Sequence, residues 1–553
     1  MNLIPNAPGL SPNYWCTWST QNFGREDEHP DYHNYLGGVG SQFARAEMNE
    51  KNLRRWLQQF PKIRGDLYLM LDDGWDVPYG VHPDKSRDRF GTLELDEERF
   101  PSFTGTPAQR LKKLNDFVKE SGWRGLGLWV PAQAAGPIEK GPAMEAYWTE
   151  RLLWCKEAGV EYWKVDWGTY AHDVEYRLFL TQLASKLYPQ LIVEHAYCMI
   201  AYNGSQLPTQ DYAGDRFAEM GEIPQKSLEI HQFSQVFRTY DVFNQMGSST
   251  TLDRTAYLLA GQGGLLTCED HVRISASLGC TAGIMRSPYW NEIEGLDYDS
   301  TLLRRRLDEV TAGVLWQRLA PAFADGQVLC SAETLTDRWL FKTGECWVDQ
   351  VFGQEIHQTA PAVIARGLPL PQVEAEGERP FVTCAQNPNG ALSVTAHRRL
   401  LPTRQEVLPP CSVTLSPPQP ASLHGGVRLL PAGGAAAARP AGRNLPGPGP
   451  EPALRGGGGC HPLRGLEGGR HPPHPRQPHR NPLPSYRHPR RPLGPFGGVR
   501  AGEGGNPLNP VPYKKIPCRA ICRRGIFYLL LLSSAGSQHF TRGISVMRRL
   551  VQP

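Results

Sequence analysis

Carboxylic acids stand at the ends of several short apolar runs in the first 270 residues of this chain. Asp166 ends the run in "EYWKVDW", Asp72 and Asp73 end "LYLMLDD", and Asp241 ends "QVFRTYDV". An apolar run that terminates in an acid delivers that acid to one end of a buried strand, where a ligand can reach it. Hydrolysis of a glycosidic bond needs two such carboxyl groups, one ionised and one protonated.

Aromatic and basic residues accompany these acids. Carboxylates accept hydrogen bonds from sugar hydroxyls, and a tryptophan face covers the apolar side of a pyranose ring. The sequence therefore predicts a carbohydrate site, and its further candidate contacts are Trp18, Trp75, Lys164, Glu194, His195 and Arg238. Lys164, two positions before Asp166, is expected to help keep that carboxylate ionised.

Each acid also has a purely structural interpretation. Asp72 and Asp73 could form a turn after a strand, although Gly74 and Trp75 behind them favour a functional role. Asp166 could be an ion-pair partner of Lys164, and Asp241 could cap a helix or pair with Arg238.

Other polar residues compete for the same roles. Asp215 in "YAGDRF" is the rival acid for Asp241. Glu269 and Asp270 are more typical of helix caps or supporting residues, and they stay outside the catalytic set. Glu194 and His195 fit a place in the pocket or directly behind it equally well.

Eight short apolar runs bounded by turn residues must position these side chains. They are "YWCTWS" at 14, "LYLMLDD" at 67, "GLGLWV" at 125, "EYWKVDW" at 161, "LIVEHA" at 191, "QVFRTYDV" at 235, "GLLTCED" at 264 and "TAGIMRS" at 281. Continuous apolar runs are typical of strands that are buried on both faces.

Segments with helical periodicity separate these runs. Examples are "AEMNEKNLRRWLQQF", "TPAQRLKKLNDFVKESG" and "MEAYWTERLLWCKEAG". Strands that alternate with helices indicate parallel pairing. Eight units of this kind predict an α/β fold, a (β/α)8 TIM barrel over residues 1–317, and a barrel of this type carries its active site at the carboxyl ends of its strands.

The pattern changes twice after the barrel. Residues 318–410 alternate and are rich in turns, which predicts a small antiparallel β domain with "NPNG" as a hairpin turn. Residues 411–510 hold 21 Pro, 20 Gly and 12 Arg, with no Lys or Asp. We interpret 411–553 as a low-complexity tail, either disordered or read out of frame, and assign it no function.

Charge and cysteine usage exclude several classes of protein. Residues 1–410 carry 39 basic and 52 acidic groups, a formal charge of −13, so nothing in the body of the chain indicates a nucleic-acid partner. The twelve Cys form no CxxC pair and have no zinc-type spacing, and no cofactor or metal is expected.

The sequence also bears on location. No segment is apolar for long enough to indicate a membrane partner. The first residues lack the pattern of a secretory signal, which favours a cytoplasmic location; a chain that begins after a removed signal would read the same. The oligomeric state has no signature in the sequence.

Five segments together resemble the melibiase-type α-galactosidases of glycoside hydrolase families 27 and 36. They are "WCTW", "NEKNLRRWLQ" leading into "LYLMLDDGW", "GTLELDEERFPSF", "YWKVDW" and "FRTYDV", in this order. The similarity runs from about residue 12 to 325. It implies a retaining hydrolase that cleaves terminal α-linked galactose-type residues from an oligosaccharide or a glycoconjugate.

The resemblance also implies roles. Asp166 in "KVDW" corresponds to the nucleophile and Asp241 in "RTYDV" to the general acid/base. Asp72 and Asp73 in "DDGW" correspond to groups that bind hydroxyls at the far side of the sugar. Trp18 corresponds to a ring platform, with Lys164 and Arg238 as further sugar contacts.

Departures from the family pattern leave the substrate open. "VEHAYC" fits neither the motif for a 2-hydroxyl, in which Glu194 could play the hydroxyl-binding part, nor that for a 2-N-acetyl group, and Trp167 after the nucleophile is unusual. An α-N-acetylgalactosaminidase and a raffinose-synthase-like transglycosylase are the alternatives on the same scaffold. A carbohydrate-binding protein without catalysis is the alternative of another class.

Overall fold

The computed structural model describes the greater part of the barrel and much of the β domain. The described residues are 4–22, 48–77, 90–197, 226, 229–230, 232–238, 241–242, 271–285, 300–324, 328–340, 355–397, 399–400, 406–408, 410–416, 423–426, 516–520 and 528–533. The predicted run at 264–270 lies outside these residues, as do Asp215, Glu269 and Asp270.

A parallel sheet forms the first part of the structure. Its described strands are β1 (Tyr14–Cys16), β2 (Tyr68–Leu71), β3 (Gly125–Val130), β4 (Tyr162–Val165), β5 (Ile192–His195), β6 (Asp241–Val242) and β7 (Gly283–Ile284). They pair in the order β5-β4-β3-β2-β1-β7-β6, and all pairs are parallel. The predicted (β/α)8 architecture is confirmed. Seven parallel strands are described, and the remaining predicted run, at 264–270, lies outside the described residues.

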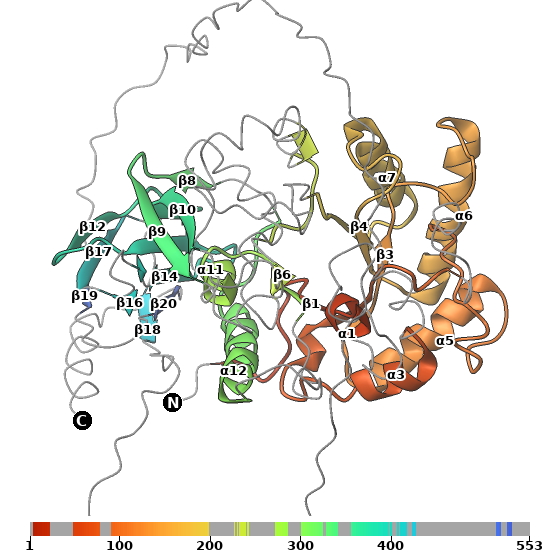
Figure 1. Cartoon of the computed structure of the whole chain (residues 1–553), viewed down its shortest axis with the longest axis horizontal. Helices are drawn as coiled ribbons and strands as arrows, with labels where there is room; N and C mark the ends of the chain where they lie inside the picture. Colours follow the sequence, from red (N-terminus) through yellow and green to blue (C-terminus); the bar gives the residue numbers. More distant parts are fainter. Residues whose placement is uncertain are drawn as a thin grey trace, which may run out of the picture. The chain divides into compact units, whose positions relative to one another are not determined.

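Helices alternate with these strands and cover the outside of the sheet. The described helices are α1 (Trp18–Asn22), α3 (Glu50–Trp56), the 3-10 helix η3 (Arg64–Asp66), α5 (Pro107–Glu120), α6 (Pro142–Ala158), α7 (Val174–Leu187), α11 (His271–Ser277) and α12 (Ser300–Gln317). Helices α5, α6 and α7 follow one another beside β3 and β4 (Figure 1). None of the described helices combines the length and apolar character needed to cross a membrane.

Local signals in the sequence fix the ends of these helices. Thr106 caps α5 in a capping box with Gln109, and Pro107 occupies the first helical turn. Helix α6 begins at Pro142 and ends at Gly159, which adopts a left-handed conformation with φ of 65°. Helices α3 and α5 lie within the predicted segments "AEMNEKNLRRWLQQF" and "TPAQRLKKLNDFVKESG", and α6 begins two residues before the predicted "MEAYWTERLLWCKEAG".

Alternation along the strands sorts side chains between two hydrophobic clusters. The inner cluster is Tyr14, Cys16, Tyr68, Met70, Tyr162, Val236 and Met285. The intervening residues, among them Trp15, Leu69, Leu71, Trp163, Val165 and Val193, belong to the cluster under the helices. Because successive side chains of a strand point to opposite faces, this parity decides which polar residues face the inside of the barrel.

The β domain that follows is antiparallel for the most part. Its described strands are β8 (Leu329–Cys330), β9 (Thr334–Leu340), β10 (Glu355–Pro361), β11 (Val363–Arg366), β12 (Gln372–Ala375), β13 (Phe381–Gln386), β14 (Leu392–His397), β15 (Arg399–Leu400), β16 (Glu406–Val407), β17 (Cys411–Leu415), β18 (Leu423–Gly426), β19 (Ile516–Ala520) and β20 (Tyr528–Ser533). The predicted "NPNG" hairpin turn joins β13 to β14, with Asn387 N donating to Ala391 O.

Four of these strands come from the segment predicted to be a tail. Strand β17 pairs with β12 and with β19, and β20 pairs with β14 and β18. Strand β20 contains "YLLLLS", whose apolar residues suit a sheet better than the Pro- and Gly-rich sequence before it. Strand pairing therefore extends past residue 410. The interpretation of 411–553 as one tail, disordered or out of frame, stays a prediction.

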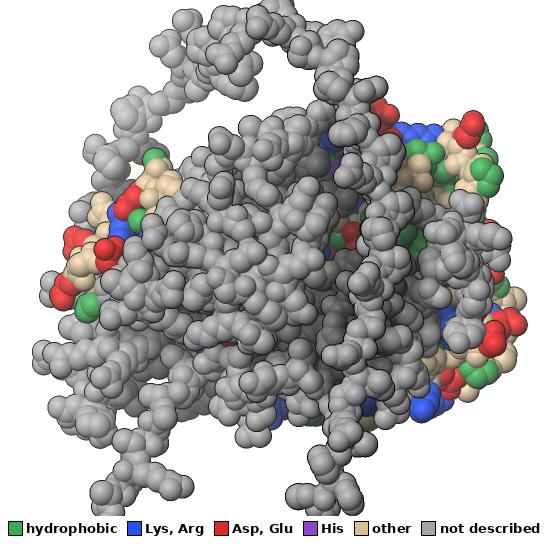
Figure 2. Space-filling model, viewed as in Figure 1, with side chains coloured by type: hydrophobic (Ala, Val, Ile, Leu, Met, Phe, Trp, Pro, Cys, Tyr) green, Lys and Arg blue, Asp and Glu red, His purple; other side chains and the backbone are tan. Residues whose placement is uncertain are grey.

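Acidic and basic side chains are interspersed over the described surface in Figure 2. Exposed pairs such as Lys112 with Asp116 belong to this mixed surface. Among the buried charged residues, Asp72, Asp73, Lys164 and Glu194 lie in or directly after β2, β4 and β5, the strands whose ends are predicted to carry the site.

Candidate active site

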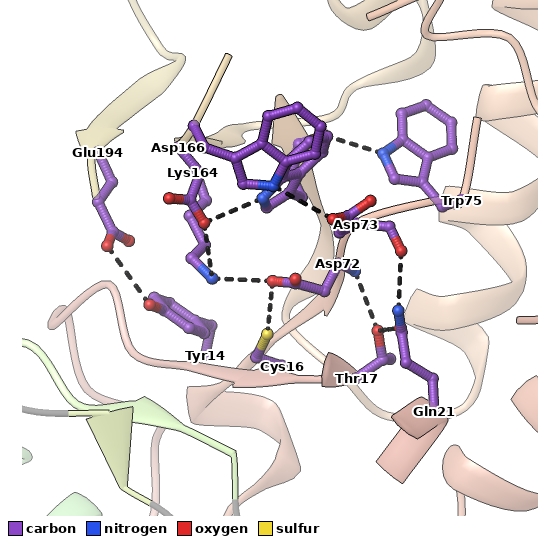
Figure 3. A network of polar contacts seen from close by, with 12 residues as sticks. Tyr14, Cys16, Thr17, Gln21, Asp72, Asp73, Trp75, Lys164, Asp166 and Glu194 are labelled. Atoms are coloured by element: carbon purple, nitrogen blue, oxygen red, sulfur yellow. Dashed lines mark hydrogen bonds and ion pairs between the residues drawn. The ribbon is translucent and has the colours of Figure 1, made fainter. Parts of the chain in front are cut away.

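Asp72 and Lys164 form a buried ion pair inside the barrel. Asp72 follows β2, and Lys164 lies in β4. Lys164 Nζ is 2.8 Å from Asp72 Oδ2, and each side chain is 4% exposed (Figure 3). Burial alone would lower the pKa of Lys164, but the negative charges of Asp72 and Asp166 raise it well above its ordinary value. Lys164 is therefore a fixed cation, and its nearest acid is Asp72 rather than Asp166.

Asp166 presents a partly exposed carboxylate beside this pair. Its side chain is 24% exposed, and Lys164 Nζ lies 3.8 Å from its Oδ2. The indole N–H of Trp129 donates to the same oxygen at 3.0 Å. Burial raises the pKa of Asp166, while Lys164 and the Trp129 hydrogen bond lower it. Both contacts go to Oδ2, so the other oxygen, Oδ1, has no partner among the described residues.

Asp73 is the third carboxyl of the cluster. Trp167 Nε1 donates to Asp73 Oδ2 at 3.2 Å, while Oδ1 is buried and makes no hydrogen bond within the described part of the chain. Burial and the neighbouring charge of Asp72 raise the pKa of Asp73 well above its ordinary value. A buried oxygen that lacks a partner is costly, and a ligand hydroxyl would remove that cost.

Residues of β1 and α1 hold the loop that carries both acids. The backbone N–H of Asp72 donates to Thr17 Oγ1 at 3.0 Å, and Gln21 Nε2 donates to the Asp73 carbonyl at 2.8 Å. Gly74 follows with φ of 91°, a conformation that suits glycine. This explains why "DDGW" needs its glycine at this position.

Two adjacent indoles, tilted by 57° to each other, each donate a hydrogen bond to one of the three carboxyls. The rings of Trp129 and Trp167 lie 5.3 Å apart between centroids, and Phe90 packs against both. The loop of Trp167 is held in place because its carbonyl accepts from Ala132 N at 2.7 Å. Trp129 stands near the end of the third predicted strand but was given no specific role from the sequence, and it is thus the direct contact of Asp166.

Glu194 and Arg238 form a second ion pair in the barrel interior. Arg238 Nε donates to Glu194 Oε1 at 2.6 Å, and Tyr162 OH donates to Oε2 at 2.8 Å. Tyr14 OH lies 3.4 Å from Oε1. Glu194 and Arg238 are 0% and 1% exposed. Both were predicted as sugar contacts; the structure brings them together as a paired, buried group.

His195 and Trp75 make their described contacts with residues around the acids rather than with the acids, and their role as sugar contacts stays a prediction. His195 is adjacent to Glu194 on β5 and so points to the opposite face, where its Nε2 contacts Thr181 Oγ1 of α7 at 2.7 Å. Trp75 is fully buried, and its Nε1 donates to the Trp129 carbonyl at 2.9 Å. Each supports a neighbour of the site from behind.

The remaining predicted residues are placed only in part. Trp18 begins α1, is half-buried and packs against the inner cluster, which is compatible with a ring platform. The backbone of Asp241 lies in β6 beside Gly283, but its side chain is outside what the structure describes. Its role as acid/base stays a prediction.

Arg177 is a further residue that the sequence did not reveal. It lies in α7, fully buried, and donates to the carbonyls of Val165 and Asp166 at 3.0 and 2.7 Å. It thereby fixes the end of β4. An arginine on a helix carries no local signal for this contact. For Trp129 the sequence does give a signal, because this residue stands near the end of the apolar run "GLGLWV".

Replacing Trp129 with Phe is expected to lower kcat/KM about tenfold, since one hydrogen bond to a charged group is lost. That bond lowers the pKa of Asp166. Without it, Asp166 is ionised only at higher pH, and the acid limb of the kcat/KM profile moves upward. The profile of the variant against nitrophenyl glycosides measures both effects.

Trp123→Phe is the matched control for this variant. Trp123 is also buried, and its indole donates to the Leu57 carbonyl at 3.0 Å, away from the acids. An equal shift of the acid limb in both variants would contradict the proposed contact between Trp129 and Asp166.

Metal chemistry receives no support from the described residues, among which no group of three or more His, Cys, Asp or Glu side chains could hold a metal ion. What the described site offers is an open carboxylate, a fixed cation, two further acids and an aromatic wall. Carboxylates can accept hydrogen bonds from hydroxyls, and an ionised, accessible carboxylate can act as a nucleophile.

Comparisons by sequence find no relative. No family model matches the chain, and the search of the curated proteins gives no match.

Comparison with solved structures gives matches of low identity. The chain is similar to a putative α-galactosidase from Bacteroides fragilis, with 12% identity, 75% of this chain and 71% of that chain covered, and a TM-score of 0.32. It is similar to a family 27 β-L-arabinopyranosidase from Geobacillus stearothermophilus, with 12% identity, coverages of 74% and 86%, and a TM-score of 0.34.

A third similar structure is a putative α-N-acetylgalactosaminidase from Bacillus halodurans, with 12% identity, coverages of 71% and 84%, and a TM-score of 0.31.

Proposed function

We propose that this protein is a retaining glycoside hydrolase that cleaves terminal α-linked galactose-type residues through a covalent glycosyl-aspartate. The observation that carries the proposal is the environment of Asp166. Its carboxylate is partly exposed, is bound by Trp129 on one oxygen, and lies 3.8 Å from the fixed cation Lys164. A nucleophile for sugar carbon needs this combination of charge, access and fixed orientation.

The reaction follows from these groups. Oδ1 of Asp166 attacks the anomeric carbon, and the bond from that carbon to the leaving oxygen breaks. Asp241 gives its proton to the leaving oxygen. Asp241 then takes a proton from water, whose oxygen attacks the same carbon and releases Asp166. In this mechanism the carboxyl groups of Asp166 and Asp241 are about 5 to 5.5 Å apart.

Asp72 and Asp73, the acids that follow β2, are the residues expected to bind the hydroxyls of the substrate. Oδ2 of Asp72 is committed to Lys164, and Oδ1 of Asp73 is buried with no partner among the described residues. Sugar hydroxyls can donate to these carboxyls or, where Asp73 is protonated, accept from it. A ring that binds here would place its hydroxyls beside Asp72 and Asp73 and its anomeric carbon beside Asp166.

A panel of nitrophenyl glycosides tests the proposal. The substrates are the α-galactoside, the α-N-acetylgalactosaminide, the β-L-arabinopyranoside and the α-glucoside. Turnover of a galactose-type substrate is expected, and proton NMR should show that the first free sugar keeps the α configuration. Release of the β-anomer first would exclude retention. Sugar-linked products on addition of an acceptor would indicate a transglycosylase, and binding of galactose without any turnover would indicate a carbohydrate-binding protein.

A further inference from the structure

We propose that Cys16 is a positioning residue for substrate binding: its thiol fixes the rotation of the Asp72 carboxylate so that one oxygen stays open to a sugar hydroxyl. The inference rests on the proposed function, because it assigns a task to Asp72 in that reaction. Cys16 ends β1 and belongs to the inner cluster of the barrel.

Two donors meet on a single oxygen of Asp72. Cys16 Sγ lies 2.9 Å from Asp72 Oδ2, and Lys164 Nζ lies 2.8 Å from the same atom (Figure 3). Neither donor bonds to the other oxygen, Oδ1, and no hydrogen bond from another described residue reaches it. A carboxylate with both donors on Oδ2 cannot exchange its two oxygens by rotation without breaking both contacts, and Oδ1 keeps one orientation.

The thiol must be protonated to act in this way. Cys16 is fully buried, and burial together with the negative charge of Asp72 raises the pKa of the thiol well above its ordinary value. The group is therefore an S–H donor and not a thiolate nucleophile. A neutral donor orients Asp72 without adding a second positive charge beside it.

The surrounding chain holds both partners of this contact. Cys16 pairs with Met70 in the β1–β2 register, and the next residue, Thr17, accepts from the backbone N–H of Asp72. Side chain and backbone of Asp72 are thus bound by consecutive residues. Asp73, the next residue along the chain, has the buried Oδ1 without a described partner. The loop therefore presents two oxygens to a ligand, Asp72 Oδ1 and Asp73 Oδ1, and Cys16 fixes the orientation of the first.

The kinetic test compares Cys16→Ala and Cys16→Ser. In Cys16→Ala only Lys164 still holds Oδ2, and the Asp72 carboxylate is less restrained. This weakens binding in the ground state and in the transition state alike, so KM should rise about tenfold with kcat nearly unchanged. Serine keeps an O–H donor and should recover most of the loss. Cys155→Ala is the control, since Cys155 is buried in α6 and contacts Trp163 rather than an acid.

A double-mutant cycle separates positioning from general damage to the fold. Once Asp72 is replaced with Ala, which leaves no acceptor for the thiol, Cys16→Ala should change KM less than twofold, because the two residues act through one contact. An unchanged KM in Cys16→Ala, equal KM values for the Ala and Ser variants, or additive effects in the cycle would each overturn the proposal.

A spectroscopic measurement decides the contact without any activity. The Raman S–H stretching band of Cys16, identified by its loss in Cys16→Ala, should lie at the low frequency of a bonded thiol and move upward in Asp72→Ala. A band that does not move would overturn the contact. If the wild-type protein turns over no glycoside, the proposed function fails, and this band still shows whether Cys16 holds Asp72.

Discussion

Asp166→Ala is expected to lower kcat/KM by about 10⁴-fold or more while the protein stays folded, because a covalent mechanism cannot proceed without its nucleophile. The backbone contacts of this residue survive in alanine: its N–H donates to Val130 O, and its carbonyl accepts from Arg177. The lost group is a carboxylate, whose raised pKa shows that the folded state disfavours its charge.

The sign of the stability change follows from that pKa. A carboxyl whose folded pKa lies above 3.8 binds its proton more tightly in the folded state than in the unfolded state. The free energy of unfolding therefore falls as the pH rises from 3.8 through the folded pKa, and ionised Asp166 lowers stability at higher pH. At neutral pH the alanine variant should therefore have an unchanged or higher Tm. A large fall in Tm would mean that lost activity reflects unfolding.

Chemical rescue identifies the role of Asp166. Azide added to the alanine variant should restore turnover by attacking the anomeric carbon from the vacated side, and the product from an α-glycoside should be the β-linked glycosyl azide. Asp116→Ala removes an exposed carboxylate paired with Lys112 and serves as the control. Activity above about 1% of wild type in Asp166→Ala, by contrast, would rule Asp166 out as nucleophile.

Lys164→Met is expected to cost about 3 to 5 kcal/mol of unfolding free energy, the range for breaking a buried ion pair by removal of one partner. Lys164 and Asp72 are each 4% exposed, and the variant leaves Asp72 charged beside Asp166 and Asp73 without a cation. Activity should fall too, because both Asp72 and Asp166 lose the charge that orients them. Urea unfolding at constant ionic strength measures the change.

The control and the pH dependence make this prediction specific. Lys112→Met breaks an exposed pair of 2.6 Å and should cost no more than about 0.5 kcal/mol. Because the folded pKa of Lys164 is raised above 10.5, its stabilising contribution is fully present below that pH and is lost only as the pH rises beyond it. Equal costs for the two variants at pH 7 would show that the buried pair does not stabilise the fold.

The sequence could predict which acidic residues of the site stand at the carboxyl ends of strands. Apolar runs ending in Asp72 and Asp166 are local patterns, and both acids lie where the barrel rule puts them. Lys164 and Asp166, two positions apart, necessarily share a face. Glu194 and His195 are adjacent on one strand and must point to opposite faces, so the same period of two allows only one of them into the pocket.

Contacts between distant segments were decided by the tertiary structure alone. The partner of Lys164 is Asp72, 92 positions away, because β2 and β4 flank β3 and their inward side chains converge. Trp129 reaches Asp166, and Cys16 reaches Asp72, through the same convergence. The sequence by itself determined which residues lie at strand ends and on which face. Only the closed packing of parallel strands decided which of those charges meet, because ion pairs and hydrogen bonds depend on distances in space that no spacing along the chain contains.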